Sequence, residues 1–222
     1  MSKLLLELHE DYIKRLISMK SSRMAWSKKH IEMNGYFWCT NAMHLLNRQC
    51  ICDDWSVWLA PFVLSCHNAD GGFSASTGCN SSIGATLCAL QILLLLGERE
   101  ALMSIRDATL EYISSLYQST GSFLGERYGE TDVQYTYSAL YCLRILNGFN
   151  HQYDVRSIAS SFRSCLNWDG AFGNSPGSES HAGSTYCCLA SLQIMNQLDS
   201  VLTQVEKDAV AEWLSQRQNA DG

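Results

Sequence analysis

Proline and basic residues are both scarce in this sequence. Only 2 of its 222 residues are Pro, so long helices are permitted, and 15 Gly supply the breaks between them. Lys and Arg total 16 against 22 Asp and Glu, and the net charge of −6 argues against a nucleic-acid or anionic-membrane binder that relies on overall charge. The longest apolar run, residues 83–96, is shorter than the roughly 20 residues of a membrane span. We therefore expect no nucleic-acid partner and no transmembrane segment.

Cysteine is abundant, with 10 residues, yet no two of them form a Cys-x-x-Cys pair. A closed structural zinc site is therefore not expected from their spacing. Acidic residues at Glu7, Glu10 and Asp11 leave no room for the apolar core of a signal peptide. Without secretion the thiols stay reduced, and most are expected to act as small buried apolar side chains. The sequence thus predicts a cytoplasmic protein.

Internal repetition is the most informative feature of the chain. Glycine-led turn signals recur, and their first glycines are separated by 50, 49 and 52 residues, at Gly71, Gly121, Gly170 and Gly222. Such turns are expected where a helix stops and φ becomes positive. We place the repeats near residues 35–69, 70–119, 120–168 and 169–220, within a single domain over residues 1–222.

Each repeat carries two helical patterns of different character. The first is apolar on most faces and is expected to be buried, over residues 35–47, 82–96, 131–147 and 180–197. The second is amphipathic, with apolar stripes at helical spacing over residues 102–116, 155–166 and 202–214. Residues 55–66 form a fourth stripe, in which Pro61 is expected to cause a kink.

Buried helices alternating with amphipathic ones predict an all-α fold. We expect an α–α barrel, or toroid, whose inner helices line a cavity and whose outer helices sheathe it. The chain would supply about four of six hairpins and would be the first part of a longer protein. An open αα solenoid buries the same stripes, so periodicity alone does not choose between the two.

The segment Pro176-Gly177-Ser178-Glu179-Ser180-His181-Ala182-Gly183 opens the last of the four expected buried helices, over residues 180–197. Ser180 is the expected N-cap. The free N–H groups and the positive end of a helix dipole suit a phosphate, and His181 can donate to an anion. An ordinary capped helix start with an exposed histidine fits the same residues. Likewise, Glu130 and Asp132 are either acids favoured by a helix dipole or contacts to a polar substrate.

Aromatic residues cluster on or near the buried helices, at Tyr36, Phe37, Trp38, Tyr135, Tyr137, Tyr141 and Tyr186. In a closed barrel some of them would face the central cavity. An apolar cavity with polar groups at its rim suits a long hydrocarbon with a charged head. Plain core packing is the alternative.

These residues together resemble the β subunits of protein prenyltransferases, most closely those of type II (Rab) geranylgeranyltransferases. The similarity covers nearly the whole chain, including residues 4–13 and the turn from Gly121 to Asp132. The strongest match is Pro176 to Gly183 followed by Tyr186-Cys187-Cys188. Farnesyl and type I subunits carry His-Gly-Gly and Phe-Cys-Gly in these places.

The resemblance implies an α–α barrel paired with an α subunit. The implied reaction transfers geranylgeranyl from geranylgeranyl diphosphate to C-terminal cysteines of Rab GTPases, which a Rab escort protein presents, with zinc activating the acceptor thiolate. His181, Ala182 and Gly183 match the family's diphosphate contact. The residues that match positions along the lipid tunnel are Asn34, Trp38, Leu87, Tyr137 and Tyr186.

Two departures from the family pattern stand out. Gln134 occupies the place of a family arginine that follows Gly-Glu-x-Asp. The family's zinc ligands, which are an Asp and a Cys in an Asp-Val-Cys-Tyr segment and a later His, correspond to positions beyond residue 222. No metal ligand and no catalytic residue is therefore expected in this chain, and the chain alone is expected to be inactive. The alternatives are a non-catalytic αα-repeat binding module, a degenerate paralogue and a terpene cyclase, although the Asp-rich acid motif of a cyclase does not occur.

Overall fold

The computed structural model describes residues 5–18, 28–46, 49–150 and 152–220. The chain divides between Tyr112 and Ile113 into two compact units. Within the described ranges the regular structure is helical, and only isolated β-bridges join the turns. None of the helices in these ranges is both long and apolar enough to cross a membrane. The prediction of an all-α chain is confirmed.

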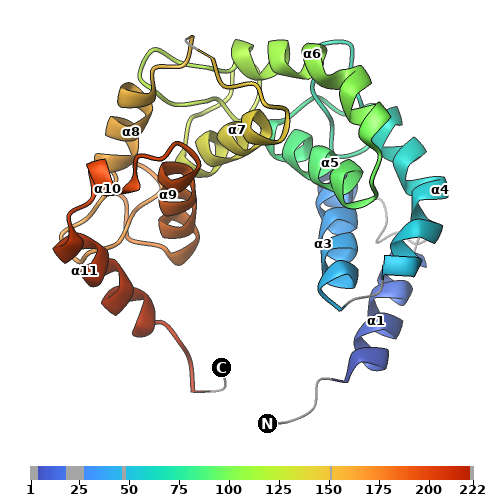
Figure 1. Cartoon of the computed structure of the whole chain (residues 1–222), viewed down its shortest axis with the longest axis horizontal. Coiled ribbons are helices and arrows are strands. Elements are labelled where there is room, and N and C mark those ends of the chain that lie inside the picture. Colours follow the sequence, from blue (N-terminus) through green and yellow to red (C-terminus); the bar gives the residue numbers. More distant parts are fainter. Residues whose placement is uncertain (1–4, 19–27, 47–48, 151, 221–222) are drawn as a thin grey trace. The chain divides into compact units, whose positions relative to one another are not determined.

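The first unit is built on a pair of adjacent helices, α3 (Glu32–Leu45) and α5 (Ile83–Leu95), which lie side by side in Figure 1. Helix α4 (Gln49–Ser65) packs against both of them and continues through Pro61. Helix α1 (Leu6–Ser18) and the short 3₁₀ helix η1 (Lys29–Ile31) precede this group. Helix α6 (Arg99–Ser115) follows it, and the last residues of α6 lie beyond the boundary. Because α5 is apolar on most faces, nine of its residues are buried, as its pattern predicts.

The second unit repeats this plan with α7 (Val133–Ile145) and α9 (Ala182–Ile194) as the adjacent pair. Helices α8 (Val155–Arg163) and α10 (Leu198–Val201) pack against α9, and α11 (Gln204–Ser215) follows. The last amphipathic stripe, residues 202–214, lies on α11 except for Leu202, because the capping box of Thr203 and Glu206 starts this helix at Gln204. Leu202, in the break between the two helices, is extended and buried.

Helices α5, α7 and α9 have matching ends. Each begins at a side-chain cap, which is Ser82, Asp132 or His181. Each is followed, one residue after its C-cap, by a residue with positive φ, namely Gly97 (78°), Asn147 (50°) or Asn196 (55°). The next backbone N–H then reaches five residues back, as in Glu98 to Leu93 at 2.9 Å. These Schellman-type ends satisfy carbonyls that the last helical turn leaves unpaired.

A buried hydrogen bond ties each glycine-led turn to the helix that follows it. The backbone N–H groups of Phe73, Phe123 and Phe172 donate to threonine hydroxyls thirteen residues later, at 3.0, 3.2 and 3.1 Å. The acceptors are Thr86, Thr136 and Thr185, and all six residues are buried. A buried N–H without an acceptor is costly, so this threonine fixes the turn against the helix in three successive repeats.

We expect Thr86→Val to lower the free energy of unfolding by about 1–3 kcal/mol, because it leaves the buried Phe73 N–H without its acceptor. Urea denaturation followed by circular dichroism measures this change. Thr86→Ser keeps the hydroxyl and is the matched control. A loss in Thr86→Ser as large as or larger than the loss in Thr86→Val would contradict the prediction, because the serine keeps the acceptor and lacks only the methyl group.

Most of the described cysteines are buried free thiols, as the sequence predicts. The buried ones are Cys39, Cys66, Cys88, Cys142, Cys165, Cys187 and Cys188, while Cys79 is exposed. Burial raises the pKa of Cys88 to about 12 and is the main cause that raises the pKa of Cys66 to about 11. Such thiols stay protonated at neutral pH and are poor nucleophiles and poor metal ligands.

Candidate functional site

The start of α9 carries the histidine that the sequence singles out. The N-cap is His181 and not Ser180, so that part of the prediction is wrong. The Ser180 hydroxyl is already engaged, because it donates to Asp169 Oδ1 at 2.7 Å and accepts from Asn167 Nδ2 at 3.0 Å. The helix consequently begins one residue later, with the exposed His181 at its positive end.

The imidazole of His181 folds back onto its own helix. Its Nδ1 accepts a hydrogen bond from the Gly183 N–H at 3.1 Å. In the neutral ring the proton then lies on Nε2, which can donate to an anion. A Cβ at Gly183 would lie 3.1 Å from ring atoms of His181, so glycine leaves room for this arrangement. Ala182 between them is exposed, and the helix start is open to solvent.

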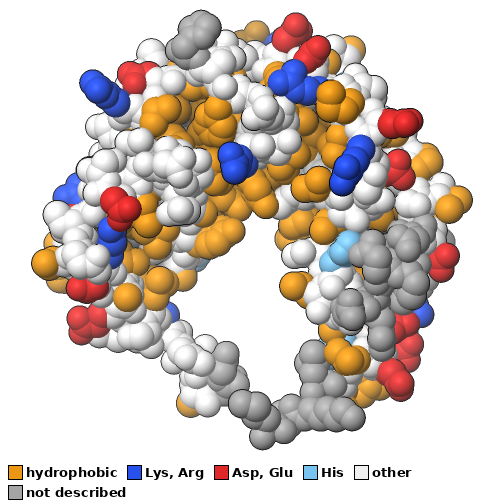
Figure 2. Space-filling view, viewed as in Figure 1, with side chains coloured by type: hydrophobic (Ala, Val, Ile, Leu, Met, Phe, Trp, Pro, Cys, Tyr) orange, Lys and Arg blue, Asp and Glu red, His pale blue; other side chains and the backbone are white. Residues whose placement is uncertain are grey.

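Two of the predicted tunnel aromatics meet across the α7–α9 pair. The hydroxyl oxygens of Tyr137 and Tyr186 are 3.1 Å apart, and their ring centroids are 5.5 Å apart in an edge-on arrangement. Tyr141 lies one turn further along α7, with its ring 5.8 Å from Tyr137. Tyr186 is 60% exposed, and Figure 2 shows hydrophobic side chains gathered over these helices. Burial, followed by the Tyr186 hydroxyl, raises the pKa of Tyr137, so this phenol is neutral at physiological pH.

The other three predicted tunnel residues lie in the first unit, on the adjacent helices α3 and α5. Trp38 on α3 is 59% exposed, and Asn34 on the same helix is half-buried. Leu87 on α5 is buried, at 7% exposure. The α3–α5 pair therefore carries one large exposed aromatic ring next to a helix that is almost wholly apolar.

Asp132, one of the two acids at the start of α7, has a structural role. Asp132 is the N-cap, and its Oδ1 accepts from the Tyr135 N–H at 2.7 Å. Asn174 Nδ2 reaches the other carboxylate oxygen at 3.4 Å. Glu130 and Gln134 are exposed on either side of it. Helix capping accounts for Asp132, in agreement with the simpler of the two interpretations made from the sequence.

The described residues do not offer a zinc site. Among them, no group of three or more His, Cys, Asp or Glu side chains is placed to hold a metal ion. Because a zinc site needs at least three such ligands, the donors present do not fit this metal. We therefore derive no step through zinc from this part of the chain.

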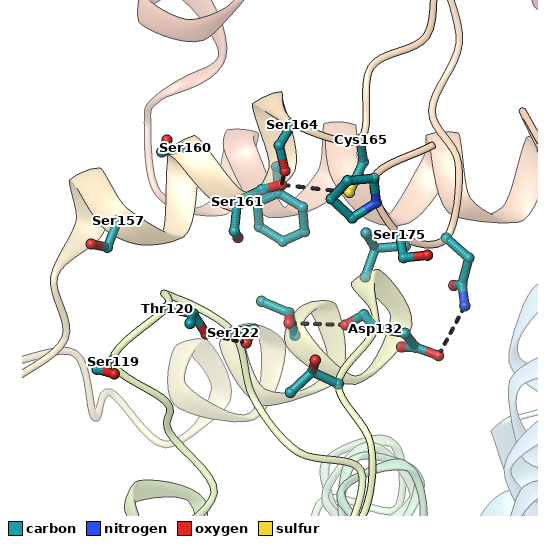
Figure 3. A pocket seen from close by; sticks show the side chains of 16 residues that line it. Ser119, Thr120, Ser122, Asp132, Ser157, Ser160, Ser161, Ser164, Cys165 and Ser175 are labelled. Atoms are coloured by element: carbon teal, nitrogen blue, oxygen red, sulfur yellow. Dashed lines mark hydrogen bonds between the residues drawn. The ribbon is translucent and has the colours of Figure 1, made fainter. Parts of the chain in front are cut away.

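A cavity in the second unit escaped the sequence analysis. It measures about 520 Å³ and lies between α8, the turn 119–122 and the start of α7 (Figure 3). Ten of its sixteen lining residues are Ser or Thr, among them Thr120, Ser122, Thr131 and Ser161. The sequence does contain a signal for this cavity. The amphipathic helices of the other repeats have an aromatic residue at the repeat position that Ser161 occupies in α8.

Comparison with known proteins identifies the family. Residues 4–222 match the prenyltransferase alpha-alpha toroid domain. The geranylgeranyl transferase type-2 subunit beta of Candida albicans is 31% identical over 95% of this chain and 63% of its own length. The corresponding subunit of Saccharomyces cerevisiae is 32% identical over 99% of this chain and 67% of its own length.

A solved structure shows the same fold. Candida albicans protein geranylgeranyltransferase-I complexed with GGPP superposes with a TM-score of 0.80 at 20% identity, over 98% of this chain and 65% of that one. The chain thus spans about two thirds of the length of these relatives. The chain therefore belongs to the prenyltransferase alpha-alpha toroid family, which includes the β subunits of protein prenyltransferases.

Proposed function

We propose that this chain is part of a type II geranylgeranyltransferase β subunit and binds geranylgeranyl diphosphate at the start of α9. The observation that carries the proposal is the His181 imidazole, which is exposed at the N-terminus of α9 with Nδ1 engaged by Gly183. Its Nε2–H and the helix dipole suit the diphosphate. Tyr186, five residues further along α9, and Tyr137 offer an aromatic surface to the hydrocarbon.

The chemistry that follows is electrostatic. In prenyl transfer the acceptor cysteine reacts as its thiolate, after its proton has been lost to solvent: the bond between C1 of the lipid and the diphosphate oxygen breaks, and a bond from the sulfur to C1 forms. Negative charge grows on the leaving diphosphate, and a donor already aimed at it lowers the barrier. His181 would supply such a donor through Nε2–H, while Ala182 and Gly183 keep the approach to the backbone open.

Three features support the rest of the assignment. The two type-2 relatives cover nearly the whole chain, which favours Rab GTPases presented by an escort protein as acceptors and an α subunit as partner. The family similarity also makes zinc a proposed cofactor, held by residues outside the described ranges. The described cysteines are free thiols, which supports a cytoplasmic location.

Three variants of His181 test the diphosphate contact. His181→Ala is expected to weaken binding of geranylgeranyl diphosphate by about 10-fold or more, which is the usual loss for a charge-assisted hydrogen bond. His181→Asp keeps a helix cap but repels the diphosphate, so it should bind poorly at unchanged thermal stability. His181→Asn keeps both a cap and an N–H donor and should retain most of the affinity.

Fluorescence titration of the 222-residue chain measures this binding, with geranylgeraniol as the ligand that lacks the diphosphate. Equal binding of geranylgeranyl diphosphate to wild type and His181→Asp would refute the contact. The acceptor is tested separately with the full-length protein and its α subunit, by comparing a Rab with its escort protein against a short peptide ending in cysteine. Transfer to the peptide alone would contradict the type II assignment.

A further inference from the structure

The amphipathic helices carry a large aromatic residue at one place in the repeat, except in α8. The intervals between Phe62, Tyr112, Ser161 and Trp213 are 50, 49 and 52 residues. The first glycines of the turns are separated by the same three intervals. Ser161 therefore stands where α4, α6 and α11 have an aromatic ring.

In two repeats the structure shows what that ring does. Tyr112 is 2% exposed, and its ring atoms lie 2.8 Å from where a Cβ on Gly72 would be, so the ring covers the glycine turn. Trp213 is 6% exposed, and its Nε1–H donates at 2.9 Å to Oδ2 of Asp169, which lies in the turn that opens the same repeat. Each aromatic residue thus seals the turn of its own repeat.

The turn of the third repeat, at residues 119–122, lacks this aromatic cover, because the small side chain of Ser161 contacts it instead. Ser161 lies on the side of α8 that faces Thr120 and Ser122, and the cavity of about 520 Å³ opens between them (Figure 3). Its volume is within the range of roughly 300–1,000 Å³ that ligand pockets occupy. Buried Phe162, Val133 and Cys165 contribute apolar surface. The cavity therefore lies where a side chain of this chain fills the neighbouring repeats.

The lining favours a hydrogen-bond donor. Ser161 Oγ is within donating distance of two carbonyls, that of Ile158 at 2.8 Å and that of Gly121 in the turn at 3.2 Å. The Thr120 and Ser122 hydroxyls bond to each other at 2.9 Å. Each of these hydroxyls keeps lone pairs that can accept another bond. Asp132 is the only charged residue of the described lining, and no cation balances it there. An anion is disfavoured, whereas an indole N–H or a phenol O–H finds acceptors.

We propose that this cavity binds the indole or phenol side chain of a tryptophan or tyrosine presented by a partner polypeptide. The partner's ring would contact the glycine turn in the way that Tyr112 and Trp213 of this chain contact the turns of their own repeats. The proposal is independent of the prenyl diphosphate site, because neither His181 nor the Tyr137–Tyr186 pair lines the cavity.

Methyl NMR of the 222-residue chain tests the site with the blocked tripeptide Gly-Trp-Gly as probe. Saturable shifts are expected at the methyl groups of Thr120, Thr131 and Thr136, which line the cavity. Thr86 is the internal control, because its repeat is sealed by Tyr112. The Gly-Leu-Gly tripeptide should give no saturable shift, and Gly-Tyr-Gly should bind like the tryptophan probe. Absent or unsaturable shifts, or equal binding of the leucine probe, would overturn the proposal.

Variants at position 161 make the test specific. Ser161→Trp is expected to weaken probe binding by about tenfold or more, because the built-in ring occupies the cavity. Ser161→Ala leaves the cavity open and should stay within about threefold of wild type. Ser161→Tyr is a second filling variant in case the tryptophan disturbs folding, which circular dichroism would reveal. Unchanged binding to a folded filling variant refutes the site.

Two further outcomes identify the source of the ring. Binding of free indole without any binding of the tripeptides would indicate a small-molecule ligand and would overturn the proposal that a partner polypeptide supplies the ring. Trp168 is 100% exposed and could serve as the ring from a second copy. Self-association that depends on concentration and is lost in both Trp168→Ala and Ser161→Trp would show that the ring comes from a second copy of this chain. That result would also overturn the proposal of a different partner polypeptide. A monomer that binds the aromatic tripeptides is the expected result.

Discussion

Replacing Gly71 with alanine is expected to lower the free energy of unfolding by about 3 kcal/mol, which combines a left-handed backbone cost with overpacking. Gly71 has φ of 86°, and an added Cβ would lie 2.0 Å from the carbonyl oxygen of Ala108 in α6. A backbone carbonyl cannot turn aside as a side chain can, so the turn must move away from the helix. Urea denaturation of the 222-residue chain measures the loss.

Gly78→Ala is the matched control for this change. Its φ of 80° is close to that of Gly71, but a Cβ there would have no atom within 4 Å. It should therefore show only the backbone cost of about 1–2 kcal/mol. If the two variants lose the same stability, the close approach of the turn to α6 contributes nothing and the positive φ explains both.

The glycine turns show how far sequence reasoning reached. Their recurrence predicts positive φ, and Gly71, Gly121 and Gly170 have values of 86°, 82° and 92°. The period does not reveal that each of these glycines touches a helix backbone 36 to 39 residues later, at Ala108, Ser157 or Ala209. That contact depends on the packing between elements, which a local turn signal does not encode.

Helix positions were predictable because burial leaves a strong apolar pattern. The expected buried helix over residues 82–96 is found as α5, Ile83–Leu95, capped by Ser82. The cap of α9 was not predictable in the same way, because both Ser180 and His181 can accept a hydrogen bond from a helix N–H. The choice depends on Asp169 and Asn167, which engage the Ser180 hydroxyl from eleven and thirteen residues away.

The chemistry of the candidate site was only partly visible in the sequence. His181 could be singled out from the sequence, yet the folded-back imidazole depends on the backbone at Gly183. The hydroxyl-lined cavity depends on a comparison between repeats, since no single serine in α8 is unusual. A polar residue at an otherwise aromatic repeat position is the kind of local inconsistency that marks functional sites.

Trp213→Ala is expected to lower the free energy of unfolding by about 3–5 kcal/mol. The ring is buried, its Nε1–H bonds to Asp169, and the Arg217 guanidinium carbon lies 4.0 Å from the ring centroid. Removing this ring is expected to leave a cavity at the turn of Gly170, similar to the one beside Ser161 at the turn of Gly121. Chemical denaturation followed by circular dichroism measures the change, with Trp168→Ala as control.

Trp213→Phe separates the hydrogen bond from the volume. Burial acts to raise the pKa of the Asp169 carboxyl, but hydrogen bonds from Ser180, Ala171 and Trp213 hold this pKa below its ordinary value of 3.8. A carboxyl with a lowered pKa stabilises the fold above its unfolded pKa, and this stability is lost as the pH falls through the folded value. The difference in the free energy of unfolding between wild type and Trp213→Phe should therefore be constant at neutral pH and become smaller below pH 3.8.

The exposed Trp168 makes the comparison decisive. Its side chain is 100% exposed, so its removal should change stability by no more than about 0.5 kcal/mol. A loss in Trp213→Ala no larger than that in Trp168→Ala would mean that the ring does not seal the third turn. The aromatic residue at this position of the repeat would then not stabilise the glycine turn. There would be no reason to expect that the place of Ser161 accommodates an aromatic side chain from a partner.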